Sequence, residues 1–191
     1  MQKPLVAIHC ITYNQAPYIA QCLDGFVMQK TTFPFVAIVH DDASTDSTAD
    51  IVREYVQKYP DIIHPIFETE NQYSKNDGSL WRIMTDAINR TEAKYVAMCE
   101  GDDYWIDTQK LQKQVDFLEK NNDFSICFHN VKIWKQVEQV LAKDFITRDA
   151  PEETTILDLA KENYIHTPSV MYRYSIQVQE SILKIGQQPV G

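Results

Sequence analysis

The chain has 191 residues, of which 44% are hydrophobic and 24% charged, a balance typical of a folded protein rather than a disordered one. This length predicts a single domain over residues 1–191 with a core of its own. With 18 Lys and Arg against 27 Asp and Glu, the net charge is −9, which argues against a nucleic-acid binder with a basic surface.

Apolar segments typical of strands alternate with amphipathic segments typical of helices along residues 5–134. The predicted strands are Leu5–Ile11, Phe35–Val39, Ile62–Phe67, Tyr95–Cys99 and Ser125–Trp134. The predicted helices are Ala16–Met28, Ser47–Lys58, Ser79–Asn89 and Thr108–Lys120. Pro65 favours an edge position for the third strand, because proline cannot donate to a neighbouring strand. The alternation predicts an α/β fold, a Rossmann-like three-layer sandwich with a mostly parallel central sheet.

The pattern is looser after Trp134. Residues 136–153 are polar and are expected to form a surface excursion. The elements expected beyond it are a helix at Ile156–Lys161, a strand at Pro168–Tyr172 and a helix at Ser175–Leu183. No stretch approaches the roughly 20 apolar residues that cross a bilayer, and the apolar run at the N-terminus is too short for a signal peptide. We therefore expect a cytoplasmic protein without a transmembrane segment, either free or peripheral at the inner face of the membrane.

The four cysteines are scattered along the chain, and no two of them form a C-x-x-C pair. Three lie in apolar segments, so buried thiols in a reducing compartment are expected, with a zinc site or a disulfide framework as the alternatives. These cysteines are Cys10, Cys22, Cys99 and Cys127.

Ligands of a parallel sheet bind beyond the carboxyl ends of its strands, so the loops after the strands carry the functional prediction. The dinucleotide fingerprint G-x-G-x-x-G does not follow the first strand, and no P-loop occurs anywhere in a chain with only 5 glycines. A glycine-rich phosphate cradle is therefore excluded, and a metal ion is the expected substitute.

The second strand leads into an acidic loop that begins at Asp41 and Asp42. Asp46 or Ser47 can cap the next helix, and Ser47 with Asp50 resembles a capping box. Asp41 and Asp42 are then not needed for capping. Adjacent carboxylates repel unless a ligand or a hydrogen-bond donor engages them, so we predict a binding role.

The strand at Tyr95–Cys99 leads into a second acidic loop that contains Glu100, Asp102 and Asp103. Asp107 or Thr108 can cap the following helix, which leaves the earlier carboxylates available. Clustered carboxylates are the hard oxygen ligands that Mg²⁺ and Mn²⁺ prefer. Gly101 would let the backbone approach a ligand closely, and the aromatic pair after the acids is either core or a site wall.

These loops, their order and their spacing resemble the inverting glycosyltransferases of family 2, which have the type-A nucleotide-sugar-binding (GT-A) fold. The resemblance covers essentially the whole chain. It rests on four segments, namely Val6–Asn14, Asp41–Asp46, Glu100–Trp105 and Lys110–Leu118.

The resemblance also implies roles for individual residues. The implied nucleotide-sugar-binding residues are Thr12, Tyr13, Asn14, Asp41, Asp42, Arg82 and Asp102. Within this set, Asp42 would accept a hydrogen bond from the base, and Arg82 would reach the phosphates. Asp103, together with Asp102, would bind Mg²⁺ or Mn²⁺ on the diphosphate. Residues expected on the acceptor side are Trp105, His166 and Ser169.

The implied reaction is a single displacement at the anomeric carbon of a nucleotide-sugar, with UDP-sugar favoured as donor. A hydroxyl of a saccharide or lipid-linked acceptor attacks with inversion, in the synthesis of cell-surface polysaccharide. A carboxylate must accept the hydroxyl proton, and family members place it in the second half of the domain, often just after a glycine. We expect this general base beyond Gly191, which would make 1–134 the nucleotide-sugar-binding half and 135–191 a partial acceptor half.

Two alternatives follow from the same residues. Without that base, the chain would be a nucleotide-sugar-binding module deficient in transfer, unless Asp149 or Glu153 folds over the cleft. A receiver-like phosphotransferase would also gather acids at strand ends, but it needs a lysine at a later strand end. Lys132 lies inside a predicted strand instead, which disfavours this alternative.

Overall fold

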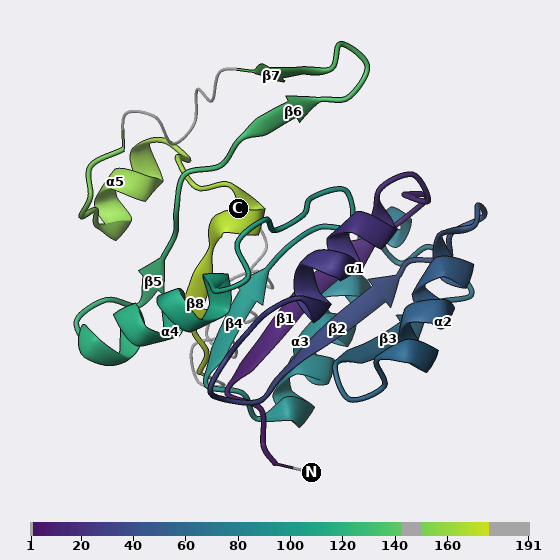
Figure 1. Cartoon of the computed structure of the whole chain (residues 1–191), viewed down its shortest axis with the longest axis horizontal. Helices are drawn as coiled ribbons and strands as arrows, with labels where there is room; N and C mark the ends of the chain where they lie inside the picture. The colour runs from purple at the N-terminus through teal and green to yellow at the C-terminus, as the bar shows by residue number, and fades with distance from the viewer. Residues whose placement is uncertain (1, 143–149, 176–191) are drawn as a thin grey trace.

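The computed structural model describes residues 2–142 and 150–175, which are organised around a central sheet of six strands. Figure 1 shows how the helices and loops surround this sheet. Its strand order is β3-β2-β1-β4-β8-β5. The parallel strands are β1 (Val6–Thr12), β2 (Phe35–Asp41), β3 (Ile63–Phe67) and β4 (Tyr95–Met98). The antiparallel strands are β8 (Met171–Arg173), which pairs with β4, and β5 (Ile126–Cys127), which pairs with β8. The mostly parallel sheet and the edge position of β3 confirm the prediction.

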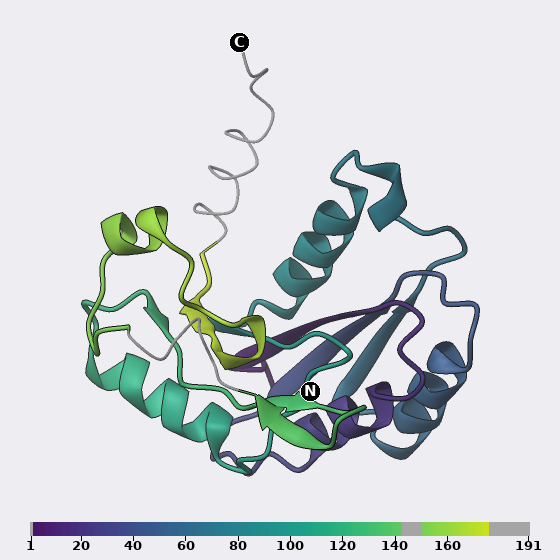
Figure 2. The ribbon, with the colours of Figure 1, turned by 90° about the horizontal axis from the view of Figure 1, so that it is seen from above.

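Helices cover both faces of the sheet (Figure 2). The described residues form four long helices, α1 (Ile19–Val27), α2 (Thr48–Lys58), α3 (Ser79–Thr91) and α4 (Lys110–Lys120). Residues of α1, α2 and α4 share one buried cluster, whereas α3 packs against the other face through Met84 and Ile88. The three-layer architecture therefore follows from strands that are buried on both faces, as expected of a parallel sheet.

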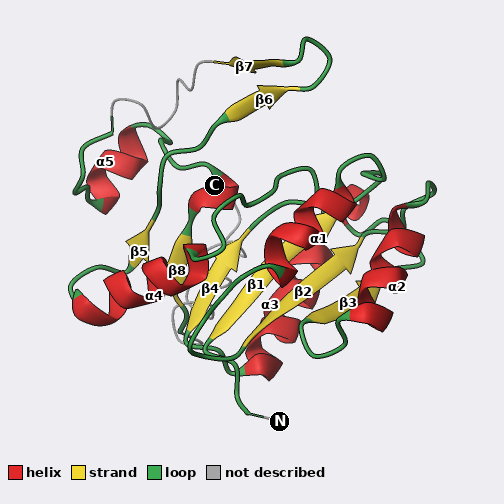
Figure 3. Ribbon diagram, viewed as in Figure 1, coloured by secondary structure: helices red, strands yellow, loops and turns green. Residues whose placement is uncertain are grey.

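The segment after α4 differs from the prediction of one long strand over Ser125–Trp134, which was wrong. The chain leaves the sheet after β5, and a separate hairpin forms from β6 (Ile133–Lys135) and β7 (Val140–Ala142) (Figure 3). Polar His129 and Asn130 interrupt the apolar run, and His129 Nδ1 lies 2.8 Å from the carbonyl oxygen of Asn130. The hairpin occupies part of the region that was expected to be a surface excursion.

The last described elements agree more closely with the sequence. Helix α5 covers Ile156–Lys161, as predicted, and a capping box between Thr155 and Asp158 begins it. The strand expected at Pro168–Tyr172 begins later, because Thr167–Ser169 form a 3₁₀ turn, η2, with proline in its first turn. The helix expected at Ser175–Leu183 lies outside the described residues beyond its first position. None of the described helices is long and apolar enough to cross a membrane.

Candidate functional site

The loops that follow β1, β2 and β4 lie side by side at the carboxyl end of the sheet. Because Thr12 and Asp41 are register partners, β1 and β2 end level with each other. The backbone N–H of Asp42 donates to the carbonyl oxygen of Thr12 at 3.0 Å, and that of Gly101 donates to Ile11 at 3.0 Å. These bonds bring the two acidic loops of the sequence to the end of the same central strand.

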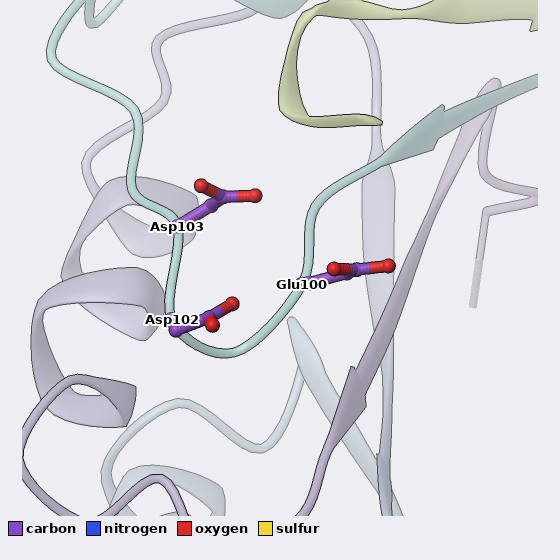
Figure 4. A group of neighbouring side chains, drawn as sticks. All are labelled: Glu100, Asp102 and Asp103. Atoms are coloured by element: carbon purple, nitrogen blue, oxygen red, sulfur yellow. The ribbon is translucent and has the colours of Figure 1, made fainter. Parts of the chain in front are cut away.

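The turn after β4 carries a cluster of three carboxylates, Glu100, Asp102 and Asp103 (Figure 4). Each offers a ligand oxygen, and these atoms all lie within 4.8 Å of one another. The backbone N–H of Asp103 donates to the carbonyl oxygen of Glu100 at 3.0 Å, which closes the turn. This acid cluster has the oxygen chemistry that Mg²⁺ and Mn²⁺ require, so its residues fit such an ion.

The electrostatics of the acid cluster also fit a cation. Partial burial, and then repulsion from Asp102 and Glu100, raise the pKa of Asp103 to about 6, while His166 opposes this shift. Burial and the charge of Asp102 likewise raise the pKa of Glu100. A divalent cation at the cluster would relieve the repulsion that raises both values.

Gly101 has no Cβ atom, which allows the acidic turn to lie directly against the side chains of Thr12 and Gln15. A Cβ atom at this position would lie 2.4 Å from Gln15 Oε1 and 2.6 Å from Thr12 Oγ1. Thr12 is buried, and its hydroxyl donates to Gln15 Oε1 at 2.8 Å. The sequence predicted that Gly101 admits a ligand, whereas in the structure it lets the acidic turn pack on Thr12.

Asp41 and Asp42 are both buried at the end of β2. The carboxylate of Asp42 accepts backbone N–H groups of Gln72 at 2.6 Å and Tyr73 at 3.0 Å. Asp41 Oδ2 accepts the N–H of Ser44 at 3.3 Å, while its buried Oδ1 has no hydrogen-bond partner among the described residues. Asp42 therefore holds the loop before α3 through these two hydrogen bonds, and it does so without any ligand.

Of the two expected caps of α2, Asp46 and Ser47, the structure uses Asp46, and the capping box of Ser47 with Asp50 does not form. Asp46 Oδ1 accepts the backbone N–H of Thr48 at 2.9 Å and also its hydroxyl. The side chain of Ser47 makes no capping hydrogen bond, so the predicted capping box was wrong. The aspartate one position earlier replaces it because its carboxylate reaches the first N–H of the helix.

The remaining residues expected on the donor side are exposed. Tyr13 is 45% exposed on the loop after β1, and Asn14 next to it accepts the N–H of Thr45 at 2.8 Å through Oδ1. Arg82 lies on α3, where its Nη1 donates to the carbonyl oxygen of Asp77 at 2.8 Å. Their roles toward a nucleotide stay predictions.

Trp105 is both a core residue and a cavity wall, whereas Tyr104 lines the same cavity but is 39% exposed, so the core interpretation holds for Trp105 alone. Trp105 is 5% exposed, its ring centroid lies 5.0 Å from that of Phe26, and its Nε1 donates to the carbonyl oxygen of Pro168 at 2.9 Å. Ser169 is buried, and its hydroxyl donates to the carbonyl oxygen of His166 at 2.6 Å. These contacts hold η2 beside the acid cluster.

A cavity of about 1250 Å³ opens next to the acid cluster. Asp102, Asp103, Trp105 and His166 line it on one side. Many other residues that line it were not predicted from the sequence, among them Tyr18, Lys110, Phe128 and Trp134. No local pattern distinguishes these residues from ordinary helix and strand positions, because they meet only after α4 and the hairpin have folded around the cavity.

Lys110 is the least expected of these cavity residues. Burial lowers the pKa of its ammonium group to about 7. Its Nζ donates to Gln114 Oε1 at 2.5 Å and lies 4.3 Å from the centroid of the Trp105 ring. Gln114 in turn donates to the carbonyl oxygen of Ser169 at 2.8 Å, so a buried lysine helps to hold η2.

The cysteines are free thiols, as expected. Cys10, Cys22 and Cys99 are buried, and Cys127 is partly buried. The thiol of Cys22 donates to the carbonyl oxygen of Glu100 at 3.4 Å. Burial raises the pKa of Cys22, so this group stays a neutral thiol behind the acid cluster.

Comparison with known proteins gives a family match and several relatives. Residues 8–177 match the family described as Glycosyl transferase family 2. The uncharacterized protein Rv1520 of Mycobacterium tuberculosis is 38% identical over 170 residues, 88% of this chain and 46% of that protein. The putative teichuronic acid biosynthesis glycosyltransferase TuaG of Bacillus subtilis is 28% identical over 200 residues, 99% of this chain and 76% of that protein. The chain thus spans about half the length of the first relatives it matches.

Solved structures share the architecture. TarS 1–349 of S. aureus, in complex with UDP, has a TM-score of 0.63 at 22% identity, covering 93% of this chain and 49% of that one. The mannosyltransferase PcManGT of Pyrobaculum calidifontis, in complex with GDP-Man and Mn²⁺, has a TM-score of 0.60 at 19% identity, covering 99% and 48%. These likenesses establish the GT-A fold. With the family match over residues 8–177, they show that this chain belongs to glycosyltransferase family 2.

Proposed function

We propose that this chain binds a nucleotide-sugar and transfers its sugar to an acceptor hydroxyl with inversion. The observation that carries the proposal is the acid cluster of Glu100, Asp102 and Asp103, which lies beside the loops after β1 and β2. A nucleoside diphosphate needs a cation on its phosphates and polar groups around its base and ribose. The carboxyl end of this sheet supplies residues for both.

The residues of the chain divide between these tasks. Asp102 and Asp103 would hold Mg²⁺ or Mn²⁺, which supplies positive charge to a diphosphate leaving group. Tyr13 and Asp42 lie on the loops where the base and ribose would bind, and Arg82, in the first turn of α3, would reach the phosphates. Trp105 and His166 line the cavity that would take the acceptor.

The relatives support a donor and a setting for this activity. TarS was solved with UDP and with UDP-GlcNAc, and PcManGT with GDP-Man and Mn²⁺. TuaG is named for teichuronic acid biosynthesis, and a further relative is a poly(ribitol-phosphate) beta-glucosyltransferase of Bacillus spizizenii, 29% identical over 119 residues. We therefore propose a UDP-sugar donor, a saccharide or lipid-linked acceptor, and a role in cell-surface polysaccharide synthesis at the cytoplasmic side of the membrane.

The second candidate is a nucleotide-sugar-binding module without transfer. It is favoured by the carboxylates of the cavity, since Asp102 and Asp103 belong to the acid cluster and Asp107 is paired with Lys113 Nζ at 2.7 Å. Glu152 also lines the cavity and lies outside the acid cluster, which favours transfer instead, whereas Glu153 is not among the lining residues and Asp149 lies outside the described residues. Comparing turnover of this chain with that of a version extended past Gly191 separates the two candidates, because equal rates would exclude a base beyond Gly191.

The proposal is tested by thermal unfolding with UDP, GDP and ADP, each with and without Mn²⁺. Binding to the folded state raises the apparent stability, so UDP with Mn²⁺ should raise the Tm. Asp103→Asn should lose the Mn²⁺-dependent part of this rise, whereas Asp50→Asn, at an exposed ion pair on α2, should keep it. No rise with any nucleotide would contradict the proposal.

A further inference from the structure

The loop after β1 is hydrogen-bonded through residues 14–16 to residues 44–48, which form the end of the loop after β2 and the first residue of α2. Three consecutive backbone N–H groups of residues 14–16 donate to side chains of residues 44–48. The bonds run from Asn14 to Ser44 Oγ at 2.9 Å, from Gln15 to Thr48 Oγ1 at 2.8 Å and from Ala16 to Asp46 Oδ2 at 3.1 Å. The hydroxyl and acidic residues that follow Asp42 are therefore engaged by the neighbouring loop.

The side chain of Asn14 makes contacts in the opposite direction. Its Oδ1 accepts the backbone N–H of Thr45 at 2.8 Å and lies 3.3 Å from the Thr45 hydroxyl and 3.4 Å from the N–H of Asp46. Asn14 has a φ of 52°, a left-handed conformation that asparagine tolerates better than most residues. One residue thus joins both loops, through its N–H and through its carboxamide.

The partner loop is itself strained. Ala43 has a φ of 61°, a left-handed conformation that is unfavourable for a residue with a Cβ atom. Asn14 donates its N–H to Ser44 and accepts the N–H groups of Thr45 and Asp46, and these bonds to the three residues after Ala43 offset the strain. Without Asn14, we expect the loop after β2 to relax away from its present conformation.

Tyr13 lies between two fixed neighbours. Thr12 is held beneath Gly101 by its bond to Gln15, and Asn14 is held by the loop after β2. Tyr13 itself stays 45% exposed. Its backbone is therefore fixed on both sides before any ligand arrives, while its ring is available for contact.

We propose that Asn14 is a positioning residue for the nucleoside part of the donor and not a donor ligand. It joins the loops after β1 and β2, so that Tyr13 and the end of β2 are already in place when a nucleoside diphosphate binds. This inference rests on the function proposed above. A site that is ordered before binding avoids the entropic cost of ordering its loops when the ligand binds. Losing the hydrogen bonds between Asn14 and residues 44–46 should therefore weaken the affinity for the nucleotide. The acid cluster belongs to another turn and keeps its own contacts.

The test compares UDP with inorganic pyrophosphate, each with Mn²⁺, by isothermal titration calorimetry. Asn14→Ala should weaken UDP binding about tenfold and leave pyrophosphate binding unchanged, because pyrophosphate has no nucleoside. Asn14→Gly, which keeps the left-handed conformation accessible, should show the same selective loss even if the alanine variant folds poorly. Glu92→Ala is the matched control, because Glu92 has a φ of 53° at the end of α3 and should affect neither ligand.

A double-mutant cycle with Ser44→Ala separates positioning from direct contact. If Asn14 acts through its hydrogen bonds to the loop after β2, the effects of Asn14→Gly and Ser44→Ala on UDP affinity should be clearly less than additive. Additive effects, equal losses of UDP and pyrophosphate, or unchanged UDP affinity in both Asn14 variants would each overturn the inference. If the unaltered chain bound pyrophosphate with Mn²⁺ but no nucleotide, the proposed function would fail first, and the inference with it.

Discussion

The backbone N–H of Gln72 donates to Asp42 Oδ1 across 2.6 Å in the buried space between β2 and the segment before α3. Tyr73 donates to the other carboxylate oxygen at 3.0 Å, and the side chain of Asn71 donates to the Asp42 carbonyl at 3.3 Å. Three consecutive residues of that segment are thus held by one aspartate. The end of β2 and the 3₁₀ turn η1 (Tyr73–Lys75) form one structural unit as a result.

Asp42→Ala should therefore destabilise the fold, apart from any effect on a ligand. It leaves two N–H groups unpaired, and a hydrogen bond to a charged group contributes about 1.5–3 kcal/mol. We expect the free energy of unfolding to fall by roughly 3 kcal/mol in urea denaturation followed by circular dichroism. Asp50→Ala, at an exposed ion pair with Arg53, should change it by less than about 1 kcal/mol. Equal effects of the two variants would contradict this account.

Gly25→Ala should also destabilise the fold, although alanine is the better helix former by about 1 kcal/mol. A Cβ atom at position 25 would lie 2.9 Å from the backbone nitrogen of Trp105 and 3.2 Å from its carbonyl oxygen. The backbone must shift, and overpacking of this kind costs about 1–3 kcal/mol. A lowered Tm and altered tryptophan fluorescence are expected. Gln21→Ala, at an exposed position of α1, should leave the fluorescence unchanged, and a raised Tm for Gly25→Ala would refute the clash.

The sequence predicted the central sheet well because periodicity is a local signal. β1, β2 and β4 are short apolar runs, and α2 begins and ends within one residue of its predicted bounds. The long strand at Ser125–Trp134 failed for a physical reason. A run of apolar residues indicates only that a segment is buried or paired with a strand. It does not indicate that one partner strand extends along the whole segment.

In the candidate site, too, contacts between residues close in the sequence could be predicted, whereas contacts between distant residues could not. The acid cluster lies within one turn, so the spacing of Glu100, Asp102 and Asp103 could reveal it. In contrast, Asp42 meets its N–H donors thirty residues later, and Trp105 meets Pro168 across 63 residues. The sequence predicted a binding role for Asp42, whereas its carboxylate accepts two backbone N–H groups of the protein. A sequence pattern does not distinguish protein N–H donors from those of a ligand.

Affinity of the acid cluster for Mn²⁺ should depend on pH in the weakly acidic range. Metal ligands must be deprotonated, and the pKa of Asp103 is raised to about 6 by burial and by its acidic neighbours. Below that pH, protonation competes with the ion, so affinity should fall by up to about tenfold per pH unit. Titration of Mn²⁺ between pH 7.5 and 5 at constant ionic strength checks this. A flat profile would show that Asp103 is not a ligand. In a separate measurement, removing the ion with EDTA should abolish the Mn²⁺-dependent rise in Tm.

Lys110 should make the stability of the fold depend on pH above neutrality. Burial lowers its pKa in the folded chain to about 7, against 10.5 for an ordinary lysine. Between these values the unfolded chain binds more protons than the folded chain, so this group makes stability rise with pH. One proton corresponds to a slope of at most about 1.4 kcal/mol per pH unit.

Lys110→Met removes the titrating group and should abolish that slope between pH 7 and 9. The difference in free energy of unfolding between the variant and the unaltered chain should therefore shift by about 1 kcal/mol per pH unit in favour of the unaltered chain. Lys113→Met is the matched control on the same helix, because Lys113 is 63% exposed and paired with Asp107. Its profile should stay parallel to that of the unaltered chain. Parallel profiles for Lys110→Met as well would mean that the ammonium remains charged in the fold, held by Gln114 and the Trp105 ring.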